Sequence, residues 1–420
     1  MTADELRSLA TAMSLHPDEF RKRTRFVIKL GRALQECGAS SERIERHLTN
    51  VCTMLSIHGS FLISPTTFTC AFWEEDEMDQ FIHIERAEAG EINLGRLWEI
   101  DRLVESIDQG HLDFSEAPDR LRELEQSPPH HSKASHAFSW ALTGASFAIL
   151  LSANPLNSIA SALISLLLFA LTRLCANAQS WKPVTLIMVA FVAGSSSAAL
   201  AGLGINPPFV ILSSIIIFIP GLALTVALTE ISVGHLISGS SRLVDATMTL
   251  LKLFFGTLSG IAVVSLVPIV GPAEPWIFPE LPAWRVWPAL LGLSIALGIA
   301  FNIPKQKMLW GTSAALIAFA SAKLGEAHFG MYAGMFIGAL SVGLFSNLFA
   351  RITRGPGSIL MTQGIILLVP GSKVYSILNH WVSGEAILPP DSAAKALMAF
   401  VALIAGLLFS NALLPPRKSL

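Results

Sequence analysis

The first third of the chain changes its spacing of apolar residues several times. From Pro17 to Cys37 apolar residues recur at helical intervals, and a second amphipathic helix runs to Gly59 with Ser40 or Ser41 as its cap. β-favouring residues then predict a hairpin of strands, and two more amphipathic helices follow. The apolar positions that carry these elements are Phe20, Val27, Leu30, Leu34, Ile44, Leu48, Val51, Phe61, Ile63, Phe68, Cys70, Phe72, Phe81, Ile82, Ile84, Leu94, Leu97, Ile100, Leu103, Leu121 and Leu124. This segment is therefore expected to be a small α+β domain.

Long apolar stretches dominate the rest of the chain. A helix needs about twenty apolar residues to cross the hydrocarbon core of a bilayer, and ten such stretches can be drawn after residue 136. Their approximate bounds are Ala137 to Ala153, Leu156 to Leu174, Val184 to Gly204, Phe209 to Leu228, Val244 to Val270, Val286 to Ile303, Met308 to Leu324, Phe329 to Ala350, Ser358 to Leu378 and Ala393 to Leu414. The predicted fold class is thus a membrane α-helical protein of about ten transmembrane helices, preceded by the α+β domain.

The ten stretches fall into two related halves. Aligning the chain with itself at an offset of 150 positions pairs Pro220 with Pro370, Gly221 with Gly371, Gly234 with Gly384 and Gly256 with Gly406. Each half then holds five spans, and because five is odd the second half must be inverted relative to the first. The expected domains are a cytoplasmic α+β domain at 1–130, a linker at 131–136, a first five-helix repeat at 137–270 and a second at 286–414.

Composition supports this division between two solvents. Hydrophobic residues make up 52% of the chain and charged residues 14%, with a mean hydropathy of +0.56, which exceeds the values of water-soluble folds. In contrast, 39 of the 60 charged residues lie at or before Lys133. The net charge of −2 gives no reason to expect a nucleic-acid partner. The four cysteines are scattered, which predicts reduced thiols and neither a disulfide framework nor a metal site.

The charges also predict an orientation. The N-terminus lacks an apolar signal sequence, so the α+β domain is expected to stay in the cytoplasm. Lysines and arginines gather on the connections that share its side of the membrane, whereas Trp276, Trp284 and Trp287 cluster at a connection on the other side. Both termini are therefore expected in the cytoplasm.

Two Pro-Gly pairs interrupt corresponding spans of the two halves. Pro220 with Gly221, and Pro370 with Gly371, should each kink or unwind the middle of a span. In an inverted pair the two breaks can meet near the midplane and expose backbone groups that need partners. A polar substrate can be that partner, which predicts a binding site; the alternative is a packing kink satisfied by neighbouring helices.

Polar residues beside the breaks extend this candidate site. The substrate-binding candidates are Thr225, Gln363, Ser372, Lys373 and Tyr375. Lys373 could neutralise a substrate carboxylate, although a lysine at a span end can also reach the headgroups. Candidates for coupling or gating are Glu230, Asp245 and Lys252. For the two acids, the alternative is that they are ordinary charges at the membrane interface.

Several segments resemble the threonine/serine exporter family. They are LGRALQECGASSERIERHL, SPTTF and NLGRLWEIDRLVESIDQGHLDFSEA in the α+β domain, and IPGLALTVALTEISVGHLISGSSRL and LVPGSKVYSIL in the spans. The resemblance implies a bacterial inner-membrane exporter of threonine and serine that uses the proton motive force. The family's motifs fall on Pro220, Gly221, Pro370 and Gly371, and its Gly-rich inner loop on Gly234 and Gly239.

The substrate stays open between two classes. A split two-chain branch of the same family, linked to succinate export, is similar as well. In this chain Ser372 and Lys373 stand where small apolar residues are commoner, which leaves a dicarboxylate as the alternative to an amino acid. No G-x-x-x-x-G-K-[ST] loop occurs, so a transmembrane gradient rather than ATP should supply the energy.

The expected function is therefore secondary export of a small polar metabolite by alternating access of two inverted halves. The expected partners are the bilayer, the substrate and coupling protons, without a cofactor, metal or nucleic acid; a homo-oligomer stays open. A membrane-tethered enzyme using His58, Ser60 and Ser64 or His83 is a second class, but neither a G-x-S-x-G nor an H-E-x-x-H motif supports it. A regulatory scaffold, in which the α+β domain binds a partner, is the third. The histidines between 130 and 136 are read as linker rather than metal ligands.

Overall fold

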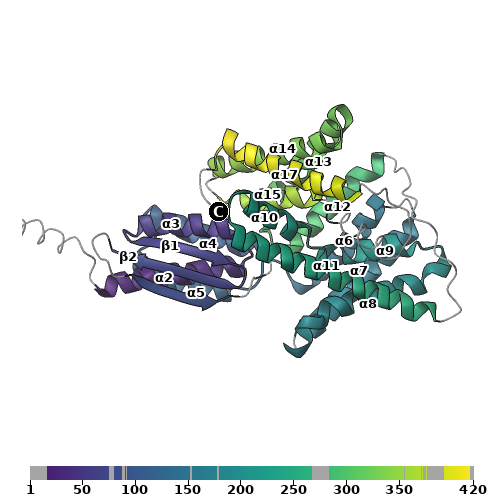
Figure 1. The fold of residues 1–420 in the computed structure, drawn as a ribbon, viewed down its shortest axis with the longest axis horizontal. Coiled ribbons are helices and arrows are strands. Elements are labelled where there is room, and N and C mark those ends of the chain that lie inside the picture. Colours follow the sequence, from purple (N-terminus) through teal and green to yellow (C-terminus); the bar gives the residue numbers. More distant parts are fainter. Residues whose placement is uncertain are drawn as a thin grey trace, which may run out of the picture.

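The computed structural model describes residues 17–74, 80–87, 90, 92–151, 154–176, 179–266, 283–353, 355–369, 371, 375 and 392–416. Residues within 17–126 form a small domain of helices and strands, termed the head, and residues within 133–416 form a larger assembly of helices, termed the helical body (Figure 1). In these ranges seven helices are long and apolar enough to cross a membrane, or eight if one bent pair counts as a single span. The chain is thus a multi-pass membrane protein with a small α+β domain, as predicted.

Four amphipathic helices form most of the head. They are α2 (Pro17–Glu36), α3 (Ser41–Met54), α4 (Leu94–Asp108) and α5 (Ala117–Gln126). Leu30 of α2 and Ile44 of α3 are fully buried, as the helical spacing predicted. Asn93 caps α4 by accepting the Arg96 N–H at 3.1 Å, whereas Ser40 stands at the N-cap of α3 without a side-chain hydrogen bond.

The sheet of the head has three strands, not the two of the predicted hairpin. The strands β1 (His58–Ser64), β2 (Thr67–Trp73) and β3 (Phe81–Arg86) pair antiparallel in the order β1-β2-β3. The first β-favouring run is divided because Pro65, which has no N–H, and Thr66 form a turn. The expected second helix also ends earlier, at Met54, and Gly59 lies within β1.

The cysteines behave as apolar residues. All four are free and buried. Burial raises the pKa of the thiols of Cys37, Cys52 and Cys70 to about 12, so these thiols stay protonated at neutral pH. Their packing in the head core agrees with the prediction that these cysteines are reduced thiols.

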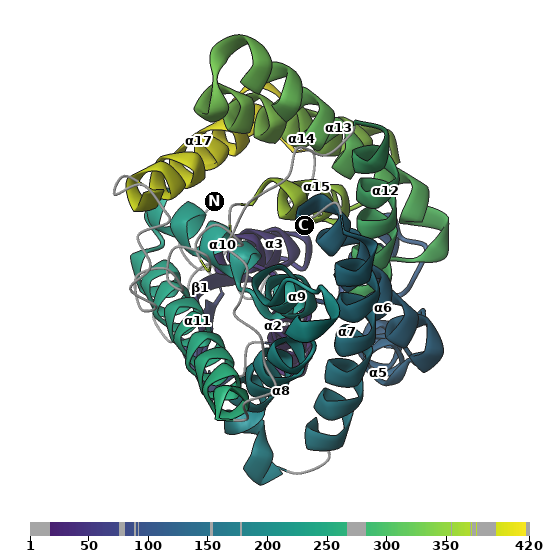
Figure 2. The same ribbon diagram turned by 90° about the vertical axis from the view of Figure 1, so that its right-hand side faces the viewer.

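Eleven α-helices form the described part of the helical body. They are α6 (Lys133–Leu151), α7 (Pro155–Ala176), α8 (Thr185–Ala199), α9 (Pro207–Ile215), α10 (Gly221–Ser232), α11 (Leu236–Ser265), α12 (Ala283–Ala300), α13 (Met308–Phe329), α14 (Met331–Thr353), α15 (Ser358–Leu368) and α17 (Ser392–Leu413). Seen from the end, α9, α10 and α15 lie inside a ring made by the others (Figure 2). The helices that contain the predicted interruptions are therefore the central ones.

The helix ends differ from the predicted spans at several places. α11 begins at Leu236 instead of Val244, because Ser238 and Arg242 contact a buried carboxylate, so this polar turn stays helical. α8 ends at Ala199 and is followed by a short 3-10 turn, and α15 and α12 are shorter apolar helices. α6 begins at Lys133, so part of the expected linker is helical.

Candidate functional site

The first predicted interruption is present. α9 gives way to a 3-10 turn, Ile216–Phe218, and α10 starts directly after Pro220, so that the two helices are bent by 54°. Pro220 takes φ −78° and ψ 44°, and the Gly221 N–H donates to the Ile219 carbonyl at 2.7 Å. Because proline has no N–H to continue the helical ladder, the span is divided at this point.

The second interruption lies at the end of α15. α15 stops at Leu368, Val369 is extended at φ −62° and ψ 126°, and the Val369 N–H closes the last turn on the Ile365 carbonyl at 3.0 Å. Gly371 is described. The predicted site residues that lie outside the described residues are Pro370, Ser372 and Lys373.

The two interruptions touch at their glycines. A Cβ added to Gly371 would lie 2.9 Å from the Gly221 Cα, and one added to Gly221 would lie 2.8 Å from the Val369 side chain. The Cβ on Gly371 would also lie 3.3 Å from the Ile219 side chain, so each glycine faces the residue two positions before the other. The backbones can approach this closely only without a side chain between them, which accounts for glycine at both positions.

A cavity of about 1080 Å³ lies between the head and these interruptions. Pro220, Gly221, Thr225 and Gly371 line it from the helical body. The head contributes the residues Gln35, Ser41, Arg43, Ile63, Asn93 and Leu97 to its wall. Such a volume accommodates a small metabolite with water. Four predicted site residues are thus brought to one cavity, which the head closes on one side.

Two other predicted residues join helices instead of lining this cavity. Gln363 on α15 is fully buried and donates through Nε2 to the Ser294 carbonyl of α12 at 2.6 Å. Tyr375 is also buried, and its hydroxyl donates to the Thr257 Oγ1 of α11 at 2.9 Å. The structure therefore places both side chains in contacts between helices.

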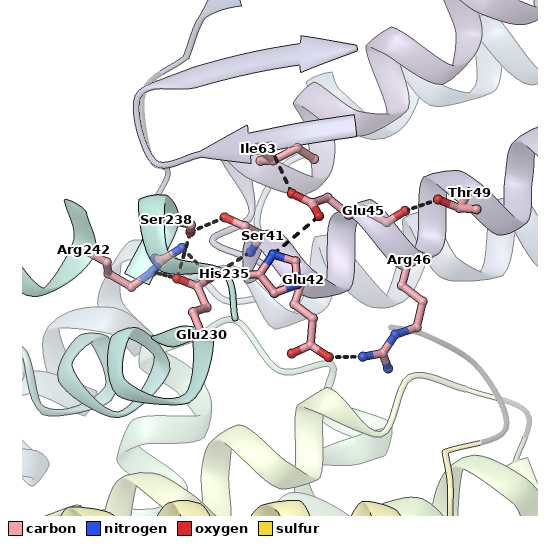
Figure 3. Close-up of polar contacts among 10 residues, drawn as sticks. All are labelled: Ser41, Glu42, Glu45, Arg46, Thr49, Ile63, Glu230, His235, Ser238 and Arg242. Atoms are coloured by element: carbon pink, nitrogen blue, oxygen red, sulfur yellow. Dashed lines mark hydrogen bonds and ion pairs between the residues drawn. The ribbon is translucent and has the colours of Figure 1, made fainter. Parts of the chain in front are cut away.

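Glu230 lies at the junction between the head and α10 (Figure 3). Its side chain is buried and accepts the Ser41 N–H at 2.9 Å and the Ser238 hydroxyl at 2.8 Å. Arg242 completes the cluster with an ion pair of 3.3 Å. Ser41 begins α3, so the carboxylate also faces the positive end of a helix. Glu230 is therefore a buried connection to the head, not the ordinary interfacial charge that was its alternative reading.

The other two candidates for coupling or gating lie on α11. Asp245 is exposed and lines the cavity, whereas Lys252 is half-buried and is not among the cavity residues. Within the described ranges neither side chain forms an ion pair. Of the three candidates, only Glu230 and Asp245 are therefore near the cavity.

Further contacts fix the head on the helical body. The Leu94 N–H donates to the Phe301 carbonyl at 3.0 Å. The Lys307 ammonium lies 4.5 Å from the centre of the Trp98 ring, a cation–π contact between η5 (Lys305–Lys307) and α4. These contacts lie apart from the Glu230 cluster, so the head is attached at more than one place.

The histidines of the expected linker belong to the same junction. His131 is buried with Nε2 at 2.8 Å from the Ile303 carbonyl, and His136 Nε2 lies 3.1 Å from the Asn302 Oδ1. No group of three or more potential metal ligands occurs in the part of the chain that the structure describes. These side chains connect the segment after the head and the start of α6 to the residues that follow α12.

Sequence reasoning missed two charged residues of α3, Arg43 and Glu45, and the histidine that faces one of them. Arg43 reaches α15, where its Nη2 lies 2.9 Å from the Met361 Sδ. Glu45 accepts the Ile63 N–H at 3.0 Å and lies 3.5 Å from the His235 Nδ1 (Figure 3). Burial raises the pKa of the Glu45 carboxyl above its ordinary value, partly opposed by these two contacts. The only available signal was that α3 carries charges beside its apolar face.

The alternative enzymatic set does not assemble on the sheet. His58, Ser60 and Ser64 alternate along β1 and share one face, whereas His83 pairs with Cys70, which faces the core. His83 therefore lies on the opposite face from the two serines. Its Nε2 instead lies 3.4 Å from the Glu85 carboxylate.

Two family models match this chain. The threonine/serine exporter model ThrE matches residues 25–264, which is more than half of the chain. A second model, "Threonine/Serine exporter, ThrE", matches residues 290–413. The matches cover the head and both halves of the helical body.

Relatives occur in bacteria and in yeasts. The threonine/serine exporter of Corynebacterium glutamicum is 25% identical over 332 residues, which cover 76% of this chain and 67% of that protein. Pheromone-regulated membrane protein 10 of Yarrowia lipolytica is 23% identical over 387 residues, which cover 87% of this chain and 32% of that protein. The chain thus spans about a third of the length of this yeast relative. No solved structure matches it.

Proposed function

Because the chain belongs to the threonine/serine exporter family, we propose that it is a secondary exporter of small polar amino acids, with threonine and serine as first candidates. The family is one of transporters and not of enzymes, which removes the membrane-tethered enzyme as an alternative. The energy source in this proposal is the proton motive force. The mechanism is alternating access of two inverted five-helix halves.

The reciprocal contact of the two glycines carries the proposal. Ile219 faces Gly371, and Val369 faces Gly221, so exchanging the two halves reproduces the same contact. A two-fold axis through this point is what inverted halves would produce, with both interruptions in the centre. Leu222 and Ala223, at the start of α10, line the cavity, and the first turn of a helix offers unpaired N–H groups to an anion.

The packing of the two halves supports the repeat. Helices α6, α7, α8, α9 and α11 have counterparts α12, α13, α14, α15 and α17 roughly 150 residues later. A Cβ added to Gly256 of α11 would lie 2.3 Å from the Ile187 carbonyl oxygen of α8. One added to Gly406 of α17 would lie 2.4 Å from the Phe336 carbonyl oxygen of α14. Each half therefore packs its last helix onto its third through a glycine.

An even number of crossings fits the arrangement of the chain ends. α6 starts at the head, and the end of α17 also lies on that side (Figure 1). There Arg351 donates to the Pro415 carbonyl at 2.8 Å. We propose a cytoplasmic head and C-terminus in a bacterial inner membrane, with ten crossings between them.

Proton coupling would use a carboxylate that reaches the cavity. Asp245 is exposed on the cavity wall, which makes it the candidate for this role. Glu230 is held by Ser41, Ser238 and Arg242, so it suits gating through the head better than proton transfer. Lys252 is a weaker candidate for coupling or gating, because it does not line the cavity.

A dicarboxylate such as succinate is the second candidate substrate. Five arginines line the cavity against four acidic residues, a small cationic excess that favours an anion. Lys373, two residues after Gly371 in the sequence, is a further candidate for binding an anion. Replacing Lys373 by Met should then impair succinate more than a neutral solute.

Counterflow in proteoliposomes would test the function. Vesicles containing the protein and unlabelled threonine should accumulate labelled threonine and serine, and an imposed pH gradient should change the rate. Labelled succinate measures the alternative, and protein-free vesicles and labelled lysine serve as controls. Accumulation of none of the three solutes above these controls would contradict the proposal, and accumulation without any response to the pH gradient would remove proton coupling.

A further inference from the structure

Arg43 places a cation of the head in the cavity of the helical body. It stands in the first turn of α3 and lines the same cavity as Gly221 and Gly371. Its Nη2 reaches the Met361 Sδ of α15, the helix that leads to the second interruption. The guanidinium therefore links the soluble domain to the first turn of α15, at the wall of the cavity.

The guanidinium forms no ion pair within the described residues, and the neighbouring Glu42 pairs with Arg46 instead. Its hydrogen bond to the Met361 thioether uses a weak acceptor, although arginine offers five donors. The Arg43 side chain is half-buried, and its removal from water lowers the pKa of the guanidinium, although the charge of Glu42 partly opposes this shift. Charges withdrawn from water in proteins are usually paired, so a half-buried arginine without an ion pair is suited to an anion that binds reversibly.

The other lining arginines are already engaged. Arg242 pairs with Glu230, and Arg46 pairs with Glu42. Arg96 donates to the Ser127 carbonyl, and Arg173 lies over the Phe169 ring. Among these cavity arginines, Arg43 is the one that reaches from the head to α15 and that has neither an ion pair nor a backbone hydrogen bond in the described part of the chain.

We propose that Arg43 binds the carboxylate of the exported solute, so that the soluble head supplies part of the binding site. The inference rests on the proposed function and specifies its substrate class as small carboxylates. The planar fork of arginine matches the two oxygens of a carboxylate, and these bonds are stronger inside a partly dry cavity than in water. A head that contributes a side chain to the binding site also explains why an exporter of small molecules carries this domain.

Replacement of Arg43 tests the assignment through substrate selectivity. Counterflow of labelled threonine should be measured for the wild type and for Arg43→Gln, with threonine and its alcohol threoninol, which lacks the carboxylate, as competitors. In Arg43→Gln the threonine concentration for half-maximal counterflow should rise roughly 10- to 100-fold, the range for a lost charged hydrogen bond. Competition by threoninol should stay unchanged.

Three further variants separate binding from structure. Met361→Leu removes the thioether contact at similar volume and should leave the threonine affinity unchanged. Arg32→Gln, an exposed arginine of the same domain outside the cavity, should do the same. Arg43→Lys keeps the positive charge without the planar fork of the guanidinium. It should therefore weaken threonine binding less than Arg43→Gln does, while competition by threoninol stays unchanged. This variant provides the readout if Arg43→Gln does not fold.

Two results would overturn the assignment. One is an equal loss for threonine and threoninol in the Arg43 variants; the other is a Met361→Leu variant that reproduces the Arg43→Gln defect. Both would mean that Arg43 only holds α15 in place. If wild-type vesicles transport succinate but not threonine, succinate and its diamide replace the pair of probes. A wild type that transports no carboxylate refutes the proposed function itself, which is a separate outcome.

Discussion

The two interrupted helices are held in chemically different ways. The helix after the first break, α10, is fixed at its far end by the ionic cluster of Glu230, Arg242, Ser238 and Ser41 at the head. The helix before the second break, α15, is fixed within the bundle by the neutral amide of Gln363. The Glu230 attachment is thus ionic and shared with a soluble domain, whereas the Gln363 attachment is uncharged and internal; the head also reaches α15 through the contact of Arg43 with Met361.

This difference shows where a membrane protein can bury charge. A carboxylate in the hydrocarbon core is costly, whereas at the head junction it gains an arginine, a hydroxyl and the first N–H of α3. Any movement of the head would therefore act on α10 through this ionic cluster and on α15 through Arg43. The second interruption would follow through its contact with Gly221.

The largest expected effect is on the contact that joins both helices. Gly371→Ala would place a Cβ 2.9 Å from the Gly221 Cα, so the two breaks must separate. Threonine efflux from proteoliposomes should fall roughly 10- to 100-fold, as expected for about 1–3 kcal/mol of strain at a transport site. Gly202→Ala, where a Cβ meets no atom within 4 Å, is the matched control. Equal activity of the two variants would argue that the breaks need not touch.

The next effect concerns the charged attachment. Glu230→Gln leaves Arg242, whose side chain is 17% exposed, without its counter-charge, which should destabilise the protein by about 3 kcal/mol. Thermal unfolding in detergent measures this. The control Glu326→Gln removes an exposed pair with Lys323 and should cost less than about 1 kcal/mol. Similar shifts in melting temperature would show that the Glu230 cluster is not a buried anchor.

A smaller effect is expected at the neutral attachment. Gln363→Met should destabilise the protein by about 1 kcal/mol, because the Ser294 carbonyl loses its 2.6 Å donor while the volume is kept. Ser294→Ala keeps that carbonyl and loses only a weaker contact at 3.3 Å, so its melting temperature should barely change. A Gln363→Met variant as damaging as Glu230→Gln would erase the contrast between the two attachments.

The smallest effect is a pH dependence at Glu45. Its pKa is raised by burial, so the folded state binds its proton more tightly than the unfolded state does, and this contribution to stability is lost as pH rises above the ordinary value of 4.5. Glu45→Gln, which carries no titrating proton, should therefore be slightly more stable than the wild type near pH 7. The advantage should shrink towards pH 4.5 in melting curves recorded across this range. A constant difference would indicate that Glu45 titrates normally.

Local patterns were sufficient to predict most of the architecture. Hydropathy located the apolar segments of the body, and Pro220 predicted a division that the structure confirms, because a missing N–H acts within one turn wherever the helix lies. The start of α11 was misplaced by the same hydropathy. Ser238 and Arg242 resemble a loop until their partner Glu230 is known.

The candidate site could be predicted only in part, because several of its contacts join residues that are far apart in the sequence. Gly221 and Gly371 were found through the spacing of the repeat, and Thr225 through its proximity to Gly221 in sequence. Arg43 could not be found, since it stands almost 180 residues before the first break and reaches the cavity only because the head docks there. Gln363 and Tyr375 were found, but their contacts with α12 and α11 could not be predicted.

The amino-acid sequence by itself determined that the chain enters lipid, that two corresponding spans are interrupted and that a polar α+β domain precedes them. These properties follow from transfer free energies and from backbone chemistry, which depend on residues close together in the chain. Only the tertiary structure decided that the interruptions touch and that the head buries Glu230 and directs Arg43 into the cavity. Such contacts join residues far apart in sequence, and their energies exist only once the packing has placed them.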